Sequence, residues 1–197
     1  MYGPGLVMAA EYWATYRRFR FLMMPMLAFT KSKAARFFGG SRTDREITEI
    51  ILHDTDSRDN GSFELTLKYL ADPSPDKPKS IHYLIGREFG QIYAMVPEGV
   101  VAYHALSHNP RAIGIEMYKK HSDKGDFTDW QYEAVSQLVY DLMLRYGIPR
   151  SKVISHASIQ SWDRKDPRGF DWLRLDTLLR KTAQFARFLD TRFSLTI

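Results

Sequence analysis

The sequence predicts an α/β fold: a single domain with a central mixed β-sheet flanked by helices, preceded by a basic and apolar N-terminal segment. Short β-branched and apolar runs alternate along the chain with longer segments of helical periodicity, an order that is typical of α/β domains. The 197 residues are 44% hydrophobic and 14% aromatic, which suits one folded domain with a sizeable core. We expect residues 1–45 to form the segment and residues 46–197 the domain.

The N-terminal segment differs from the rest of the chain in charge. Residues 1–45 carry eight Lys and Arg against two acids, whereas residues 46–197 carry twenty against twenty-one. The domain therefore lacks the basic excess of a nucleic-acid-binding protein, and we expect no nucleic-acid partner. Within the segment, three arginines precede the apolar run 21–29. This pattern fits either a basic helix resting on the domain or on a membrane, or an export signal that starts late, but the run is too short to span a membrane.

The first elements of the domain follow directly after this segment. The β-branched run 47–53 predicts a buried strand whose last residue is His53. Ser62 is a suitable N-cap for a helix that continues to about residue 71. Three prolines keep residues 72–78 out of regular structure.

Four apolar runs predict further strands: residues 81–85, 91–96, 100–104 and 112–118. Glu116 is the single acid in the last run. Thr128 and Gln131 then form a capping box for a long helix, which Gly147 ends. A short strand and a last helix complete the domain, at residues 153–155 and about 170–188.

Three residues with metal-binding side chains stand at the ends of apolar runs or before a proline: His53, His156 and Asp166. The chain has no Cys, so a metal ion must be bound by His, Asp or Glu. Two imidazoles and one carboxylate leave the fourth tetrahedral position of Zn²⁺ to water, as in hydrolytic zinc sites. A single His after a strand is more often a packed residue, so the argument depends on how these residues combine with other motifs.

Those motifs occur in a fixed order between residues 47 and 175: ILHDT around His53, SIHYLI at 80–85, AYHA at 102–105, Asn109 before IGIE at 113–116, FT at 127–128, QY at 131–132, His156, DP at 166–167 and FDW at 170–172. In this order and at these separations they resemble the zinc-dependent N-acetylmuramoyl-L-alanine amidases of the type-2 amidase and peptidoglycan-recognition superfamily, which includes phage lysozyme-like amidases. The resemblance implies a mixed sheet flanked by helices and one Zn²⁺ ion bound by His53, His156 and Asp166. It also implies hydrolysis of the amide between the lactyl group of N-acetylmuramic acid and L-alanine.

The same resemblance implies roles for three charged residues. Glu116, in the IGIE motif, is expected to accept the proton of the attacking water. The family places a cation two residues before the third ligand, where it stabilises the developing oxyanion. Counting back from Asp166 gives Arg164, whereas the usual identity of this residue favours Lys165.

Four further positions match residues that line or support the substrate cleft of the family: His82, Tyr103, His104 and Asn109. A structural, hydrogen-bonded role suits both histidines equally well. Leu106 departs from the family, which commonly has Gly at this position. We expect Lys119 and Lys120 to form a solvated pair of charges.

The sequence thus predicts a zinc amidase that acts on peptidoglycan or on muropeptides. The alternative is a peptidoglycan-binding module without catalysis. A zinc peptidase is a third option, but the chain has no His-Glu-x-x-His motif. The substrate favours the bacterial cell envelope, periplasmic or extracellular, over the cytoplasm, and the basic residues 1–45 are compatible with association with a membrane or an anionic envelope surface.

Overall fold

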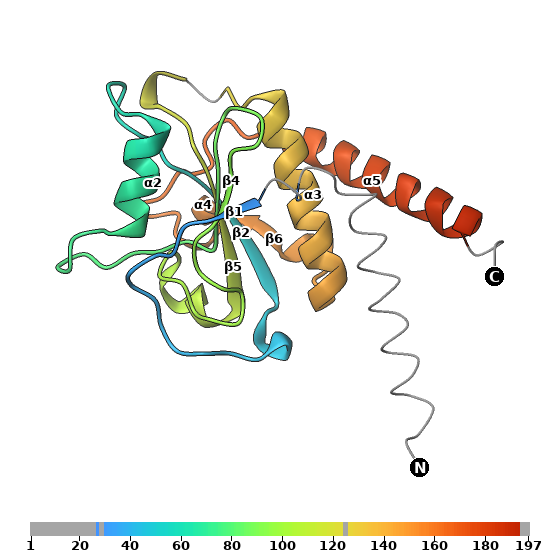
Figure 1. Ribbon diagram of the computed structural model, residues 1–197, viewed down its shortest axis with the longest axis horizontal. Coiled ribbons are helices and arrows are strands. Elements are labelled where there is room, and N and C mark those ends of the chain that lie inside the picture. Colours follow the sequence, from blue (N-terminus) through green and yellow to red (C-terminus); the bar gives the residue numbers. More distant parts are fainter. Residues whose placement is uncertain (1–26, 28–29, 124–125, 194–197) are drawn as a thin grey trace, which may run out of the picture.

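The computed structural model describes residues 27, 30–123 and 126–193, and the expectations for residues 1–26 lie outside this part of the chain. The described chain forms three layers (Figure 1). A central sheet lies between helix α2 (Phe63–Ala71) on one face and helices α3 (Asp129–Tyr146) and α5 (Trp172–Phe193) on the other. The predicted α/β architecture is therefore confirmed.

Six strands of the described residues form one mixed sheet in the order β1-β4-β3-β5-β2-β6. Their bounds are β1 (Thr30–Ser32), β2 (Glu49–Asp54), β3 (Tyr83–Ile85), β4 (Ile92–Ala94), β5 (Ala112–Met117) and β6 (Val153–Ser155). All neighbouring pairs are parallel except β3 and β4. The two central strands, β2 and β5, are almost entirely buried, as expected for parallel strands covered on both faces.

The helix ends follow the predicted capping residues. The Ser62 side chain accepts a hydrogen bond from the Leu65 amide at the start of α2. Thr128 and Gln131 form the predicted capping box of α3, and Gly147 ends this helix in the left-handed conformation with φ of 66°. Within the described chain, no helix combines the length and the apolar character needed to cross a membrane.

The strand expected at residues 100–104 is absent. Val101 donates a backbone hydrogen bond to Gly40 and accepts one from Gly39, at 3.0 and 2.7 Å. An irregular segment before β2 thus satisfies the backbone that a sheet ladder would otherwise satisfy, and the apolar run is partly buried, with Ala102 fully covered. Strand β1, which pairs with β4 at one edge of the sheet, was not predicted by any pattern in the sequence.

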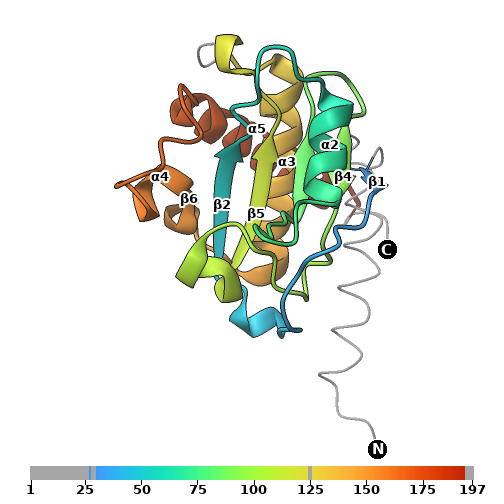
Figure 2. The ribbon, with the colours of Figure 1, turned by 90° about the vertical axis from the view of Figure 1, so that its left-hand side faces the viewer.

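Side-chain alternation divides the core between the two faces of the sheet. Leu52 and Ile115 pack in the larger cluster beneath α3 and α5, whereas Leu84 packs in the smaller cluster beneath α2. Because successive side chains point to opposite faces, His53 and Glu116 lie on the α2 face. Strands β2 and β5 run side by side (Figure 2), and His53 and Glu116 are direct partners in their register.

A partly buried acid, Glu98, joins the sheet to α3 at a distance from these two residues. Glu98 accepts hydrogen bonds from the Tyr83 and Tyr146 hydroxyls and from both Arg145 terminal nitrogens, one of them at 2.8 Å. Burial alone would raise the pKa of Glu98, but the Arg145 guanidinium and the two hydroxyls lower it to about 2. The Glu98 carboxylate is therefore ionised at neutral pH.

Replacing Glu98 by Gln should lower the free energy of unfolding by about 2 kcal/mol at pH 7, because Arg145 loses one of its two carboxylate partners and keeps only Asp141. The pKa of Glu98 falls from 4.5 to about 2 on folding, so its contribution is complete above pH 4.5 and is lost as the pH falls toward 2. Urea unfolding of both proteins at pH 7 and at pH 3 measures this. Glu133→Gln, at an exposed position of α3, is the control and should change little. An equal loss for both variants would contradict the assignment.

Candidate metal centre and its cleft

Three neighbouring pieces of backbone carry the predicted metal-binding residues. His53 is next to the last residue of β2, and His156 is the first residue of α4 (His156–Ile159), directly after the adjacent strand β6. Asp166 lies in the loop after α4, and its carbonyl accepts a hydrogen bond of 2.9 Å from the Ala157 amide. The loop thereby returns to the start of the helix that carries His156.

The structure brings one atom of each residue to a common point. His53 Nδ1, His156 Nδ1 and Asp166 Oδ2 form a triangle with sides of 3.0, 3.0 and 3.1 Å. Ligands of a tetrahedral zinc ion at bond lengths of about 2.0–2.1 Å are about 3.3 Å apart, so small shifts would accommodate the ion. Three lone-pair donors directed at one point repel each other unless a cation or protons lie between them. By geometry and by donor chemistry, these three residues are therefore suited to hold a metal ion.

The hydrogen bonds behind His53 are consistent with metal binding through Nδ1. His53 Nε2 lies 3.0 Å from His104 Nδ1, so a proton on Nε2 leaves Nδ1 free for a metal. His104 can reach this position only because residue 114 is Gly. A Cβ atom at Gly114 would lie 2.7 Å from His104 Nδ1 and 2.5 Å from a methyl group of Ile81.

His156 has an equivalent partner in Gln160. The Gln160 Nε2 group donates to Asp163 at 2.9 Å, and the carboxylate can only accept, so Gln160 Oε1 faces His156. His156 Nε2 lies 3.1 Å from that oxygen and must carry the proton. Its Nδ1 lone pair therefore points toward His53 and Asp166.

The surroundings of these residues favour the protonation states that a metal requires. Burial lowers the pKa of His53 below its ordinary value, against the opposing effect of Asp166. Burial alone would raise the pKa of Asp166, yet the close contacts with the His156 and His53 rings hold it below its ordinary value. A neutral imidazole and an ionised carboxylate are the metal-binding forms of these groups.

Glu116 lies on the neighbouring strand and lines the same cleft. Burial raises the pKa of Glu116 well above its ordinary value, and the nearby charges of Asp166 and Asp54 raise it further. Lys79 has the opposite, smaller effect. A carboxyl group with this environment beside a metal site is suited to accept a proton near neutral pH.

The cleft above the three metal-binding residues has a volume of about 910 Å³. Its cations come from two walls: Lys77 and Lys79 from the proline-rich loop, and Arg164, Lys165 and Arg168 from the loops around Asp166. Both residues expected to stabilise an oxyanion, Arg164 and Lys165, are thus exposed on the cleft wall. The Arg164 guanidinium lies 3.5 Å from the Asp163 carboxylate.

The four expected substrate-binding residues fall into two groups. Tyr103, His104 and Asn109 line the cleft, and the Asn109 side chain also accepts hydrogen bonds from the His104 and Ala105 amides at 3.0 and 2.6 Å. His82 is fully buried. Its Nδ1 accepts from the Gly114 amide at 3.0 Å, and its Nε2 lies 2.8 Å from Arg42. The structure thus places His82 in the interior, behind the cleft wall.

The region of the chain that carries these residues matches a known protein family. The family model described as Amidase_2, N-acetylmuramoyl-L-alanine amidase, matches residues 43–169. The chain belongs to this family. The match includes every residue of the candidate metal centre.

Relatives of known name agree with this membership. The chain is 31% identical over 108 residues to N-acetylmuramoyl-L-alanine amidase A of Achromobacter lyticus, covering 55% of this chain and 58% of the relative. The crystal structure of a selenomethionine derivative of AmpD has a TM-score of 0.67 at 25% identity and covers 78% of this chain and 96% of AmpD. AmiD from E. coli, solved with anhydro-N-acetylmuramic acid-L-Ala-D-gamma-Glu-L-Lys, has a TM-score of 0.56 at 26% identity, with 68% of this chain and 57% of AmiD covered. The chain spans about half the length of the curated relatives it matches.

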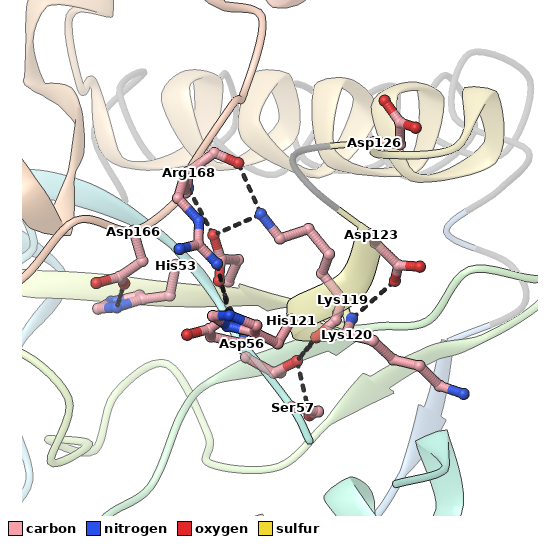
Figure 3. Close-up of polar contacts among 12 residues, drawn as sticks. His53, Asp56, Ser57, Lys119, Lys120, His121, Asp123, Asp126, Asp166 and Arg168 are labelled. Atoms are coloured by element: carbon pink, nitrogen blue, oxygen red, sulfur yellow. Dashed lines mark hydrogen bonds and ion pairs between the residues drawn. The ribbon is translucent and has the colours of Figure 1, made fainter. Parts of the chain in front are cut away.

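Two residues of the site region differ from expectation. Leu106 has φ of 47°, in the left-handed region that favours Gly, which is the residue that the family resemblance led us to expect here. The Leu106 side chain is exposed at the edge of the cleft. Lys119, expected in solvent, is instead fully buried, and only Lys120 extends outward (Figure 3).

Sequence reasoning also missed Gln160, the partner of His156. The signal that could have found it is its spacing, since a residue four positions after a helical His lies on the same face. Gln160 is 5% exposed, which excludes an ordinary surface role.

Replacing Gln160 by Leu should lower metal affinity about 10-fold to 100-fold, because the proton of His156 loses the acceptor that keeps it on Nε2. Gln160→Glu retains an acceptor for His156 but loses the hydrogen bond to Asp163, so it should bind zinc more tightly than Gln160→Leu and serves as the comparison. Competition for zinc with a chromogenic chelator gives both affinities. Equal affinity for the two variants would show that Gln160 does not orient His156.

Proposed function

We propose that this protein is a zinc-dependent N-acetylmuramoyl-L-alanine amidase. It would hydrolyse the amide bond between the lactyl group of N-acetylmuramic acid and L-alanine in peptidoglycan or in muropeptides. The observation that carries the proposal is the convergence of His53, His156 and Asp166 next to Glu116 on the floor of one cleft. Family membership supports the same reaction.

Zinc is the metal that suits these donors. Two imidazole nitrogens and one carboxylate oxygen, with a fourth direction open to the cleft, match the ligand sets of hydrolytic zinc enzymes. A zinc ion bound by these residues would polarise the amide carbonyl and lower the pKa of water. The chain's own residues supply the remaining functions.

Glu116 is the proposed general base. Its carboxylate would take the proton from the attacking water and deliver it to the leaving amine of L-alanine. Burial and two neighbouring acids raise its pKa, whereas the positive charge of a bound metal would lower it toward neutrality. The pKa of Glu116 would then lie in a range in which the group can both accept and release a proton.

The cations of the cleft suit an acidic substrate and an anionic intermediate. Arg164 or Lys165 would stabilise the negative charge that develops on the carbonyl oxygen. Tyr103, His104 and Asn109 line the wall against which the sugar or peptide would lie. AmiD from E. coli binds a muropeptide as its substrate in the crystal, which supports the same class of ligand for this cleft.

We also propose that the protein acts in the bacterial cell envelope, where its substrate lies. Residues 1–45 carry a net charge of +6, which would favour association with anionic envelope surfaces or membranes. In this proposal they form a segment with its own role, and residues 46–197 form the amidase domain.

The test is incubation of the purified protein with intact peptidoglycan and with soluble muropeptides, followed by mass spectrometry. Free stem peptides that begin with L-alanine, lost on chelation and restored by zinc, are expected. If a folded, zinc-loaded sample binds peptidoglycan but releases no peptide from either substrate, the protein is a recognition module instead.

Glu116→Gln should reduce amidase activity about 10²-fold to 10⁴-fold, because the amide cannot accept the proton of the attacking water. Zinc content should remain unchanged, since Glu116 is outside the metal-binding trio. Metal analysis of the variant and the rate of peptide release are the two measurements. Retention of more than a tenth of the activity would rule out Glu116 as the base.

The variants Arg164→Met and Lys165→Met separate the two candidate cations. Loss of the cation that contacts the oxyanion should lower kcat about 10²-fold to 10³-fold, as for other oxyanion donors. The other variant should affect mainly KM, because it removes only a charge from the cleft wall. Comparable kcat values for both variants and the unsubstituted protein would exclude an oxyanion role for either residue.

A further inference from the structure

Lys119 is a charged residue that the proposed reaction does not use, and it lies in the interior. Its side chain is 0% exposed, and its amino group lies 3.2 Å from Asp54 Oδ2, whose side chain is 1% exposed. The same amino group donates a hydrogen bond of 2.7 Å to the backbone carbonyl of Arg168. It also lies 4.9 Å from the centre of the Phe127 ring, in the core beneath α3 and α5.

Asp54 binds the backbone N–H of Arg168, the residue whose carbonyl Lys119 binds. Asp54 Oδ2 accepts a hydrogen bond of 2.5 Å from the Arg168 amide. The N–H and the C=O of Arg168 are therefore both bound by one buried ion pair (Figure 3). The Arg168 side chain makes a separate, exposed contact with Asp56 at 2.7 Å.

This arrangement connects directly to the metal-binding residues. Asp54 follows His53 in β2, and Arg168 is two residues after Asp166. The other end of the loop is fixed by the 2.9 Å hydrogen bond between the Ala157 amide and the Asp166 carbonyl. The loop that carries Asp166 is thus attached on one side to the helix of His156 and on the other to the strand of His53.

A buried ion pair is poor evidence for a contribution to stability. Removal of two charges from water costs several kcal/mol per ion, and apolar residues of similar volume often replace such pairs without loss of stability. The Lys119–Asp54 pair is distinguished by what it binds, which is the backbone of an irregular loop. Side-chain groups bind the N–H and the C=O of Arg168 there, because this residue belongs to no strand or helix that would satisfy them.

We propose that Lys119 and Asp54 are positioning residues that hold Asp166 in place for metal binding. The proposal rests on the proposed zinc site. With the pair intact, the carboxylate is already directed at the two imidazoles before the ion arrives. Without it, the loop must be ordered when the metal binds, and the affinity falls by the cost of that ordering.

The test measures zinc affinity by chelator competition for the full chain and for Lys119→Met. We expect a 10-fold to 100-fold loss in the variant, the usual effect of changes behind the ligands. Lys120→Met removes the same charge from the next residue, which points away in Figure 3, and should bind zinc like the unsubstituted protein. Thermal unfolding of each metal-free protein, recorded in parallel, shows whether a variant is folded.

Two further variants keep the outcome decisive. If Lys119→Met does not fold, the double variant Asp54→Asn with Lys119→Met removes both charges and leaves neither one buried alone. It should fold and still bind zinc at least 10-fold more weakly. Arg168→Ala removes only the exposed contact with Asp56, keeps the backbone hydrogen bonds, and should retain the affinity.

A folded Lys119 variant that binds zinc within two-fold of the unsubstituted protein overturns the positioning role and leaves the amidase proposal intact. Failure of the unsubstituted protein to bind zinc overturns the proposed metal site, and the positioning role with it. Zinc binding by the unsubstituted protein, measured first, distinguishes the two failures.

Discussion

The parallel register of β2 with its neighbours determines which side chains reach the cleft. His53 pairs with Glu116 on β5, and Leu52 pairs with Ser155 on β6, the residue before His156. Side chains alternate between the two faces of a sheet, so a shift of one residue would turn His53 into the apolar core beneath α3 and α5. The same shift would bring Leu52 to the cleft. The register is held by the apolar residues of both strands, and the chemistry of the site therefore depends on packing on the opposite face.

Around this frame, residues outside the candidate metal centre determine the orientation of the two imidazole rings within it. His104 and Gln160 each lie against the Nε2 atom of one imidazole, which leaves both Nδ1 atoms directed at Asp166. His104 in turn depends on the absent side chain of Gly114 and on the hydrogen bond that Asn109 accepts from its amide. Each of these contacts removes an alternative ring orientation, so less order has to be imposed when a metal binds.

Features encoded by short local patterns could be predicted from the sequence. The capping box of Thr128 and Gln131 and the strand ending near His53 are defined by neighbouring residues, and both are present. The meeting of His53, His156 and Asp166 could be inferred only through a family resemblance, because no local rule brings residues 103 and 113 positions apart together. Burial of Lys119 could not be predicted, since a Lys-Lys pair next to an apolar strand has the pattern of a solvated surface. Residues 100–104 misled the prediction for a related reason: apolar character reports burial but not the partner that satisfies the backbone.

Two carboxylates removed from most solvent, Glu98 and Asp54, bind different kinds of partner. Glu98 binds side chains of β3 and α3, so its charge links two regular elements that already pack against each other. Asp54, with Lys119, binds the backbone of an irregular loop. Loss of the first interaction is felt by the whole fold, because the elements that it joins belong to the main core. In the proposed positioning role, loss of the second interaction acts first on the segment that carries Asp166. Metal affinity and global stability would then depend mainly on different charges of this structure.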